Sequence, residues 1–108
     1  ELKHGPIAMV EPSMTVVVLA PRDSLYEKTV SNLQEVKARG GRIVVLGPEN
    51  DESTARMGDH YIGVPFKDEW SDPIVAAVPL QLLAYEVALL RGTDVDKPRN
   101  LAKSVTVE

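Results

Sequence analysis

Two short runs of branched aliphatic residues constrain the fold of this chain more than any other feature. Residues 15–20 read TVVVLA and residues 42–47 read RIVVLG. Neither run alternates apolar with polar residues, so both faces of each strand must be covered, as in parallel sheets. The segment between them carries apolar residues at spacings of three and four, which is typical of an amphipathic helix, and it ends at Gly40-Gly41. The sequence therefore predicts a strand–helix–strand unit of an α/β fold with a parallel sheet and flanking helices.

Capping and turn residues predict the ends of the other elements. Ser24 and Glu27 stand three apart, which is the spacing of a capping box at the start of the first helix. Residues 48–59 are polar and rich in turn formers, which favours a surface loop with at most one helical turn. Residues 60–64 are predicted to be a third strand. Pro73 suits the first turn of a last helix, and Gly92 suits the position just beyond its end.

The last helix is apolar around almost its whole circumference. Such a helix needs covering on more than one side, and Pro79 inside it predicts a kink. Three strands and two main helices also make an incomplete layer for a parallel sheet. Because the chain begins at Glu1 rather than at methionine, we expect it to be part of a longer polypeptide whose remaining strands precede Glu1.

Composition excludes several classes of protein. The chain has 108 residues, of which 44% are hydrophobic, and this is enough for one packed domain. The net charge of -4 and the scattered basic residues argue against a nucleic-acid partner. The absence of cysteine removes disulfides and thiolate metal sites. The longest apolar run is interrupted and falls short of a membrane span, and no secretory signal is present at residues 1–10, so we expect a soluble cytoplasmic protein.

Two residues near the ends of the chain are candidates for chemistry. His4 precedes Gly5-Pro6, which places its imidazole on a loop or a helix end where it can exchange protons near neutral pH. Lys103 is flanked by small and apolar residues, a setting that disfavours the ammonium form and frees the amine to attack a carbonyl. Spacing and composition alone favour the alternatives, a surface histidine without a task and a solvated tail lysine.

Other signals for chemistry are weak. The sequence contains no glycine-rich phosphate fingerprint and no metal-ligand spacing, so we expect no metal and no cofactor. His60 opens a predicted strand and is assigned a structural role. The acidic pairs Asp51-Glu52 and Asp68-Glu69 fall in predicted loops and are interpreted as solubilising.

Three segments of the chain carry a resemblance to a known family. Residues 1–6 read ELKHGP, residues 78–85 read VPLQLLAY, and residues 92–108 read GTDVDKPRNLAKSVTVE. Together they resemble the carboxyl-terminal part of the glucosamine-6-phosphate synthases, the isomerising glutamine:fructose-6-phosphate aminotransferases. The similarity runs over the full chain and is most specific in the last thirteen residues.

The resemblance implies a fold and an activity. Residues 1–91 would be part of the second sugar isomerase (SIS) domain, with flavodoxin-like layering, and residues 92–108 would be a tail that closes over the sugar site. The family makes glucosamine 6-phosphate, for hexosamine biosynthesis, from fructose 6-phosphate and ammonia. A separate glutaminase domain of the same polypeptide releases that ammonia from glutamine.

The resemblance also implies roles for particular residues. His4 matches the histidine that helps open the sugar ring and reaches the substrate of the neighbouring subunit in a homodimer. Lys103 matches the lysine that forms a Schiff base with the open sugar, Ala102 matches a position whose backbone touches the sugar, and Val105 lies near the ammonia route. The enolising glutamate and the phosphate-holding residues of the family lie upstream of Glu1, so we expect the isolated chain to be inactive.

Two alternatives of other classes remain open from the sequence. The chain can belong to a non-catalytic SIS module that senses a sugar phosphate, which needs no imine-forming amine at Lys103. It can also be a dimerisation piece whose apolar surface drives self-association.

Overall fold

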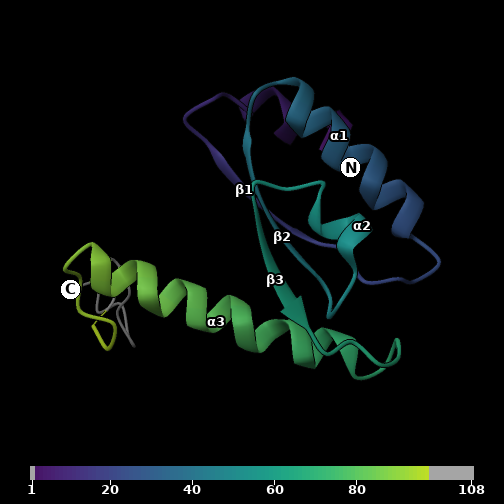
Figure 1. The fold of residues 1–108 in the computed structure, drawn as a ribbon. Helices are drawn as coiled ribbons and strands as arrows, with labels where there is room; N and C mark the ends of the chain where they lie inside the picture. The colour runs from purple at the N-terminus through teal and green to yellow at the C-terminus, as the bar shows by residue number, and fades with distance from the viewer. Residues whose placement is uncertain (1, 98–108) are drawn as a thin grey trace, which may run out of the picture. The chain divides into compact units, whose positions relative to one another are not determined.

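The computed structural model describes residues 2–97 and contains a three-stranded parallel sheet (Figure 1). The strands are β1 (Thr15–Leu19), β2 (Arg42–Pro48) and β3 (His60–Val64), arranged in the order β1-β2-β3. All three predicted strands are confirmed, and both pairings are parallel. The chain forms two compact units, Glu1–Ala76 and Ala77–Glu108, and the sheet lies in the first.

The pairing register explains why the two aliphatic runs are continuous rather than alternating. Val16 pairs with Ile43 and Val18 with Val45, so these four side chains share one face of the sheet. Val17 pairs with Val44 and Leu19 with Leu46 on the opposite face. Each face of β1 and β2 therefore carries an apolar set.

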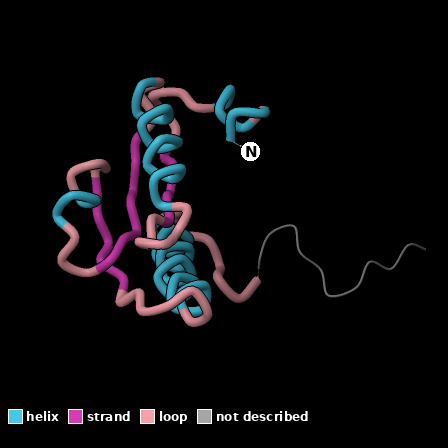
Figure 2. The backbone as a smooth tube through the Cα atoms, turned by 90° about the vertical axis from the view of Figure 1, so that its right-hand side faces the viewer, coloured by secondary structure: helices cyan, strands magenta, loops and turns pink. Residues whose placement is uncertain are grey.

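Helix α1 (Tyr26–Ala38) covers the first of these faces (Figure 2). Its apolar residues fall at helical spacing and pack against β2 to form the main core. The buried members of this core are Ala20, Tyr26, Leu33, Val36, Ile43 and Val45. The opposite face is less covered by the described residues, since Val17 and Leu19 each remain 39% exposed.

The end of α1 agrees with the sequence, but its beginning does not. Gly40 adopts a left-handed conformation with φ of 77° and its amide donates to the Lys37 carbonyl, which ends the helix as expected. The predicted capping box of Ser24 and Glu27 is wrong, because Leu25 is the N-cap residue and its side chain makes no capping bond. The Asp23 carboxylate accepts from the amide of Leu25, the N-cap residue itself, at 2.8 Å.

Three short helical segments complete the first unit. The 3-10 helices η1 (Leu2–His4) and η2 (Pro6–Met9) precede β1, and Leu2 packs against the core while Ile7 is buried. Helix α2 (Glu52–Ala55) is a single helical turn in the loop after β2, within the prediction of at most one turn there. Asn50 precedes it with φ of 62°, a left-handed conformation that asparagine tolerates better than most residues.

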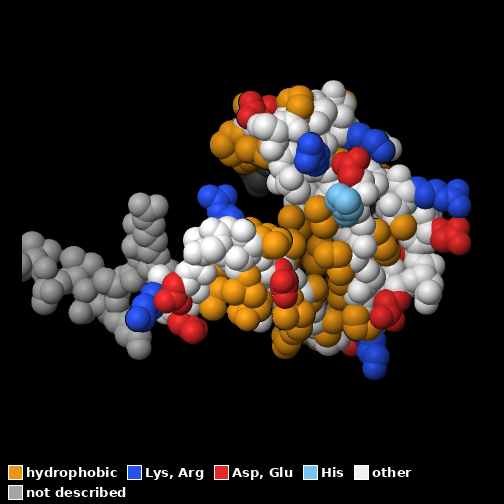
Figure 3. All heavy atoms as spheres, turned by 60° about the vertical axis from the view of Figure 1, so that its left-hand side comes forward, with side chains coloured by type: hydrophobic (Ala, Val, Ile, Leu, Met, Phe, Trp, Pro, Cys, Tyr) orange, Lys and Arg blue, Asp and Glu red, His pale blue; other side chains and the backbone are white. Residues whose placement is uncertain are grey.

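Helix α3 (Asp72–Leu90) has the predicted ends, with Pro73 in its first turn and Gly92 at φ of 67° just beyond it. Among the residues of this helix, Ala76 at the end of the first unit is buried. Figure 3 shows hydrophobic side chains on its surface. The most exposed are Ile74, Val78, Leu82 and Leu90.

Helix α3 also has the length and composition of a membrane span. It has 19 residues, and its mean hydropathy over an 18-residue window is 1.8. The sequence-based expectation that this segment falls short of a span is therefore wrong for these two properties. Because apolar core helices of globular domains meet the same criteria, length and composition alone do not assign the helix to a membrane.

Candidate functional site

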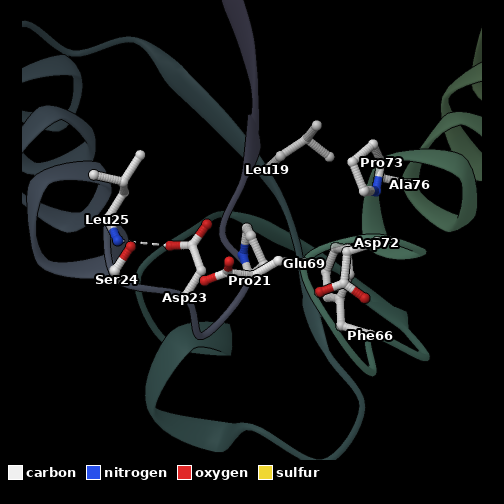
Figure 4. A pocket seen from close by; sticks show the side chains of 10 residues that line it. All are labelled: Leu19, Pro21, Asp23, Ser24, Leu25, Phe66, Glu69, Asp72, Pro73 and Ala76. Carbon is white, nitrogen blue, oxygen red and sulfur yellow. Dashed lines mark hydrogen bonds between the residues drawn. The ribbon is translucent and has the colours of Figure 1, made fainter.

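The carboxyl ends of the three strands meet at one edge of the sheet, where ligands of parallel α/β folds usually bind. The loops that follow β1 and β3, together with the first turns of α3, line an open pocket of about 390 Å³ at this edge (Figure 4). Its lining is Leu19, Pro21, Asp23, Ser24, Leu25, Phe66, Glu69, Asp72, Pro73 and Ala76. The walls are mainly apolar.

Two of the three carboxylates in this lining hold the loops in place. Asp72 accepts from the backbone amides of Lys67 and Asp68 at 2.7 and 3.1 Å. Asp23 accepts from the Leu25 amide, as Figure 4 shows. Because backbone amides already bind these carboxylates, their presence in the lining has a structural explanation.

A clamp between Arg22 and Asp51 joins the loop after β1 to the start of α2. The guanidinium Nε and Nη2 donate to the two carboxylate oxygens at 2.7 and 2.9 Å. Arg22 also donates to the Ser53 hydroxyl and lies 4.0 Å from the centre of the Tyr26 ring. A bidentate pair with a stacked aromatic ring fixes the guanidinium in one orientation.

A buried chain of hydroxyls continues the clamp into the core. Thr54 is fully buried, and its hydroxyl donates to Asp51 Oδ2 at 2.6 Å. The Tyr26 hydroxyl, 2.6 Å from Thr54 Oγ1, therefore donates to that oxygen. Asp51 also accepts from the Thr54 amide at 3.1 Å as the N-cap residue of α2. The clamp residues Arg22, Tyr26, Asp51 and Thr54 thus form one network.

The clamp changes the acidity of its carboxylate. The Arg22 guanidinium holds the pKa of Asp51 far below its usual range, with further contributions from hydrogen bonds donated by Ser53 and Thr54. Since the folded pKa is lower than the unfolded pKa of about 3.9, ionised Asp51 stabilises the fold above that pH. This stability is lost progressively as the pH falls below about 4 toward the folded pKa.

We therefore expect acid to destabilise the segment around Asp51, residues 48–58, more in the unmodified protein than in an Asp51→Asn variant. Amide hydrogen exchange of residues 48–58 should be measured between pH 6 and pH 3 in the full-length protein. The difference in protection between the two proteins should shrink as the pH falls, because only the unmodified protein carries the titrating carboxylate. A difference that stays constant over this range would contradict the assignment.

The clamp corrects one interpretation of the sequence. Asp51 and Asp68 are not merely solubilising, because Asp68 accepts from the amides of Trp70 and Ser71 and Asp51 caps α2 and pairs with Arg22. Glu52 fits the original interpretation better, since it pairs only with the exposed Arg56. Arg22 and Asp51 each lie shortly after the end of a strand, but only the folded sheet brings the two loops together.

His4 lies at the end of η1 and is exposed, as its sequence context predicted. The adjacent Lys3 donates to Glu35 of α1 at 2.6 Å, which ties the histidine-bearing segment to that helix. A groove of about 260 Å³ beside the imidazole is lined by Lys3, His4, Lys28, Ser31 and Asn32. This arrangement leaves the imidazole accessible to a molecule in the groove.

The other predicted site residues, Ala102, Lys103 and Val105, lie outside the described residues 2–97. The structure therefore gives no relation between them and His4. His60 is the first residue of β3, where it pairs with Val44. Within residues 2–97, no three His, Asp or Glu side chains gather where they could hold a metal ion.

Comparison with known proteins extends these observations. The model of the SIS domain family matches residues 1–91. The chain is 57% identical over its whole length to glutamine–fructose-6-phosphate aminotransferase (isomerising) of Thermus thermophilus, and 56% identical to that of Pseudomonas aeruginosa. The 108 residues span 18% of the length of each of these relatives.

A solved structure gives the same result for the fold. The C-terminal domain of glucosamine-fructose-6-phosphate aminotransferase from Francisella tularensis superposes with a TM-score of 0.82 at 42% identity. The match covers 90% of this chain and 28% of that one. With its three parallel strands and flanking helices, the chain belongs to the SIS domain family.

Proposed function

We propose that this chain is part of the isomerase half of an enzyme that makes glucosamine 6-phosphate from fructose 6-phosphate and glutamine-derived ammonia. The observation that carries the proposal is similarity at 54–57% identity over the whole chain to the carboxyl-terminal part of isomerising aminotransferases. The same observation favours an enzyme over a sugar-phosphate sensor, since these relatives are named as enzymes.

In this proposal two side chains carry the chemistry. The neutral amine of Lys103 attacks the C2 ketone of the open sugar, and loss of water from the adduct leaves an imine, which takes up one proton from solvent to become the iminium ion. His4 moves a proton to or from the ring oxygen while the sugar opens, a role that suits an accessible imidazole. The backbone at Ala102 contacts the bound sugar next to the reacting amine.

The proposal includes an organisation of the polypeptide. Residues 1–91 form the SIS part, which the extent of the family match supports, and residues 92–108 form a tail that closes over the sugar. The active site is shared between two subunits of a homodimer, with His4 serving the neighbouring one. A glutaminase domain of the same polypeptide supplies ammonia, and the enzyme works in the cytoplasm.

Reductive trapping tests the covalent step. The full-length protein should be incubated with fructose 6-phosphate and borohydride, digested, and mapped by mass spectrometry. Borohydride reduces an imine to a stable secondary amine, so we expect the mass of the reduced sugar phosphate on Lys103. Incubation without sugar is the blank, and Lys97 in the same region is an internal control that should stay unmodified. An adduct on another lysine, or none, would remove Lys103 from this role.

A further inference from the structure

Two residues on the solvent side of α1 are poor choices for the middle of a helix. Ser31 and Asn32 lie inside α1, although serine and asparagine compete with helical hydrogen bonding and are less favourable there than alanine. Neither side chain hydrogen-bonds to another of the described residues 2–97. Helix formation and internal hydrogen bonding therefore do not account for them.

Both residues share a helix face with a lysine. Lys28, Ser31 and Asn32 stand at positions i, i+3 and i+4, so their side chains are neighbours on the surface of α1. Within the described part of the chain Lys28 takes part in no ion pair. The face thus presents an ammonium, a hydroxyl and an amide, all of which can donate hydrogen bonds.

The segment η1 brings two more donors to the same place. Lys3 and His4 complete the lining of the groove of about 260 Å³, and none of its five lining residues is acidic. The nearby carboxylate of Glu35 is held by Lys3 at 2.6 Å, so it does not compete for Lys28. A concave surface with several donors, and with an ammonium that no carboxylate of residues 2–97 pairs, favours a compact anion.

We propose that this groove binds a phosphate monoester or inorganic phosphate, with Lys28, Ser31 and Asn32 as its ligands from α1. The proposal rests on the proposed function in one respect, which is that His4 at the end of the groove serves a sugar phosphate. The groove is a second anion site beside the imidazole, separate from the phosphate-holding residues expected upstream of Glu1, and it raises the local concentration of the anionic substrate. Ser31 and Asn32 then have a binding role that compensates for their low helix propensity.

Differential acetylation of the full-length protein tests the groove directly. Acetic anhydride modifies lysines, and the rate at Lys28 should be read from its peptide in phosphate and in chloride of equal ionic strength. Bound phosphate should slow acetylation by the factor 1 + [L]/Kd, which is about threefold at twice the dissociation constant. Lys37 on the same helix lies outside the groove and should react at one rate in both salts.

A double variant separates ligand binding from general screening. Ser31→Ala with Asn32→Ala keeps Lys28 and improves helix propensity, so α1 should form, and the protection of Lys28 should disappear.

Protection by fructose 6-phosphate alone identifies the sugar phosphate as the ligand, and protection by inorganic phosphate as well shows that the phosphate group suffices. Equal protection of Lys28 and Lys37, no protection, or protection by uncharged fructose overturns the proposal. The readout is independent of turnover and of Lys103.

Discussion

Replacing Lys103 by arginine in the full-length protein should lower kcat for glucosamine 6-phosphate formation by roughly 10³- to 10⁶-fold, the range seen when catalytic nucleophiles are lost. Arginine keeps the positive charge but stays protonated in proteins, so it cannot attack the ketone. Binding of fructose 6-phosphate should persist, because the substitution removes a bond that forms only after binding. Steady-state turnover and equilibrium binding of the sugar phosphate should be measured on the same preparation.

The matched control is Lys97→Arg. Lys97 is exposed and lies six residues earlier in the same region, so the same change of side chain there should leave kcat and KM unaltered. If Lys103→Arg retains turnover, the assignment of Lys103 as the imine-forming amine is excluded. If it loses both turnover and sugar binding, the lysine binds the substrate rather than attacking it.

Replacing Asp51 by alanine should give the largest loss of stability among single changes in the clamp. The variant loses the N-cap of α2, which is worth about 1 kcal/mol. It also leaves the buried hydroxyl chain of Tyr26 and Thr54 with one donor unpaired, at a cost of roughly 1–3 kcal/mol. We therefore expect the free energy of local opening around residues 48–58 to fall by about 3 kcal/mol. Hydrogen exchange of the full-length protein measures this quantity.

Glu52→Ala is the matched control for that substitution. Glu52 is the next residue, but its carboxylate is 83% exposed and pairs only with Arg56 one turn away. Exposed pairs of this kind contribute about 0.5 kcal/mol or less. Equal effects of the two substitutions would show that Asp51 acts as an ordinary surface carboxylate, in contradiction to the network described above.

The strands and the carboxyl-terminal ends of the two main helices were predictable because local chemistry determines them. The runs before Ala20 and before Pro48 are apolar on both faces, and only a covered parallel sheet satisfies that pattern. Gly40 and Gly92 both adopt left-handed conformations at helix ends, where a side chain is disfavoured. These signals are local and need no knowledge of the rest of the fold.

The clamp was not predictable from the sequence because it is a long-range feature. Arg22 and Asp51 are 29 residues apart, and their pairing depends on β1 and β2 ending at the same edge of the sheet. Because its partner Arg22 is distant in the sequence, Asp51 was interpreted from the sequence as a solubilising residue rather than as half of an ion pair. In the loop after β1 the predicted capping box does not form, because the helix begins one residue later, with Leu25 as its N-cap residue, and Asp23 accepts from the Leu25 amide.

The candidate catalytic residues were found through family resemblance rather than through spacing. His4 and Lys103 stand 99 positions apart, and no local pattern links them. The structure confirms the exposed position of His4 at a helix end, whereas Lys103 lies beyond the described residues. The groove beside His4 was missed because its donors come from two segments that meet only in the folded chain.

The clamp has a consequence for how this region can evolve. Arg22, Tyr26, Asp51 and Thr54 satisfy one another, so a single replacement leaves its former partners unpaired. Such substitutions are strongly epistatic, and each is tolerated better once its partners have changed. Homologous chains should therefore exchange the four positions as a group, with an apolar set replacing the ionic one.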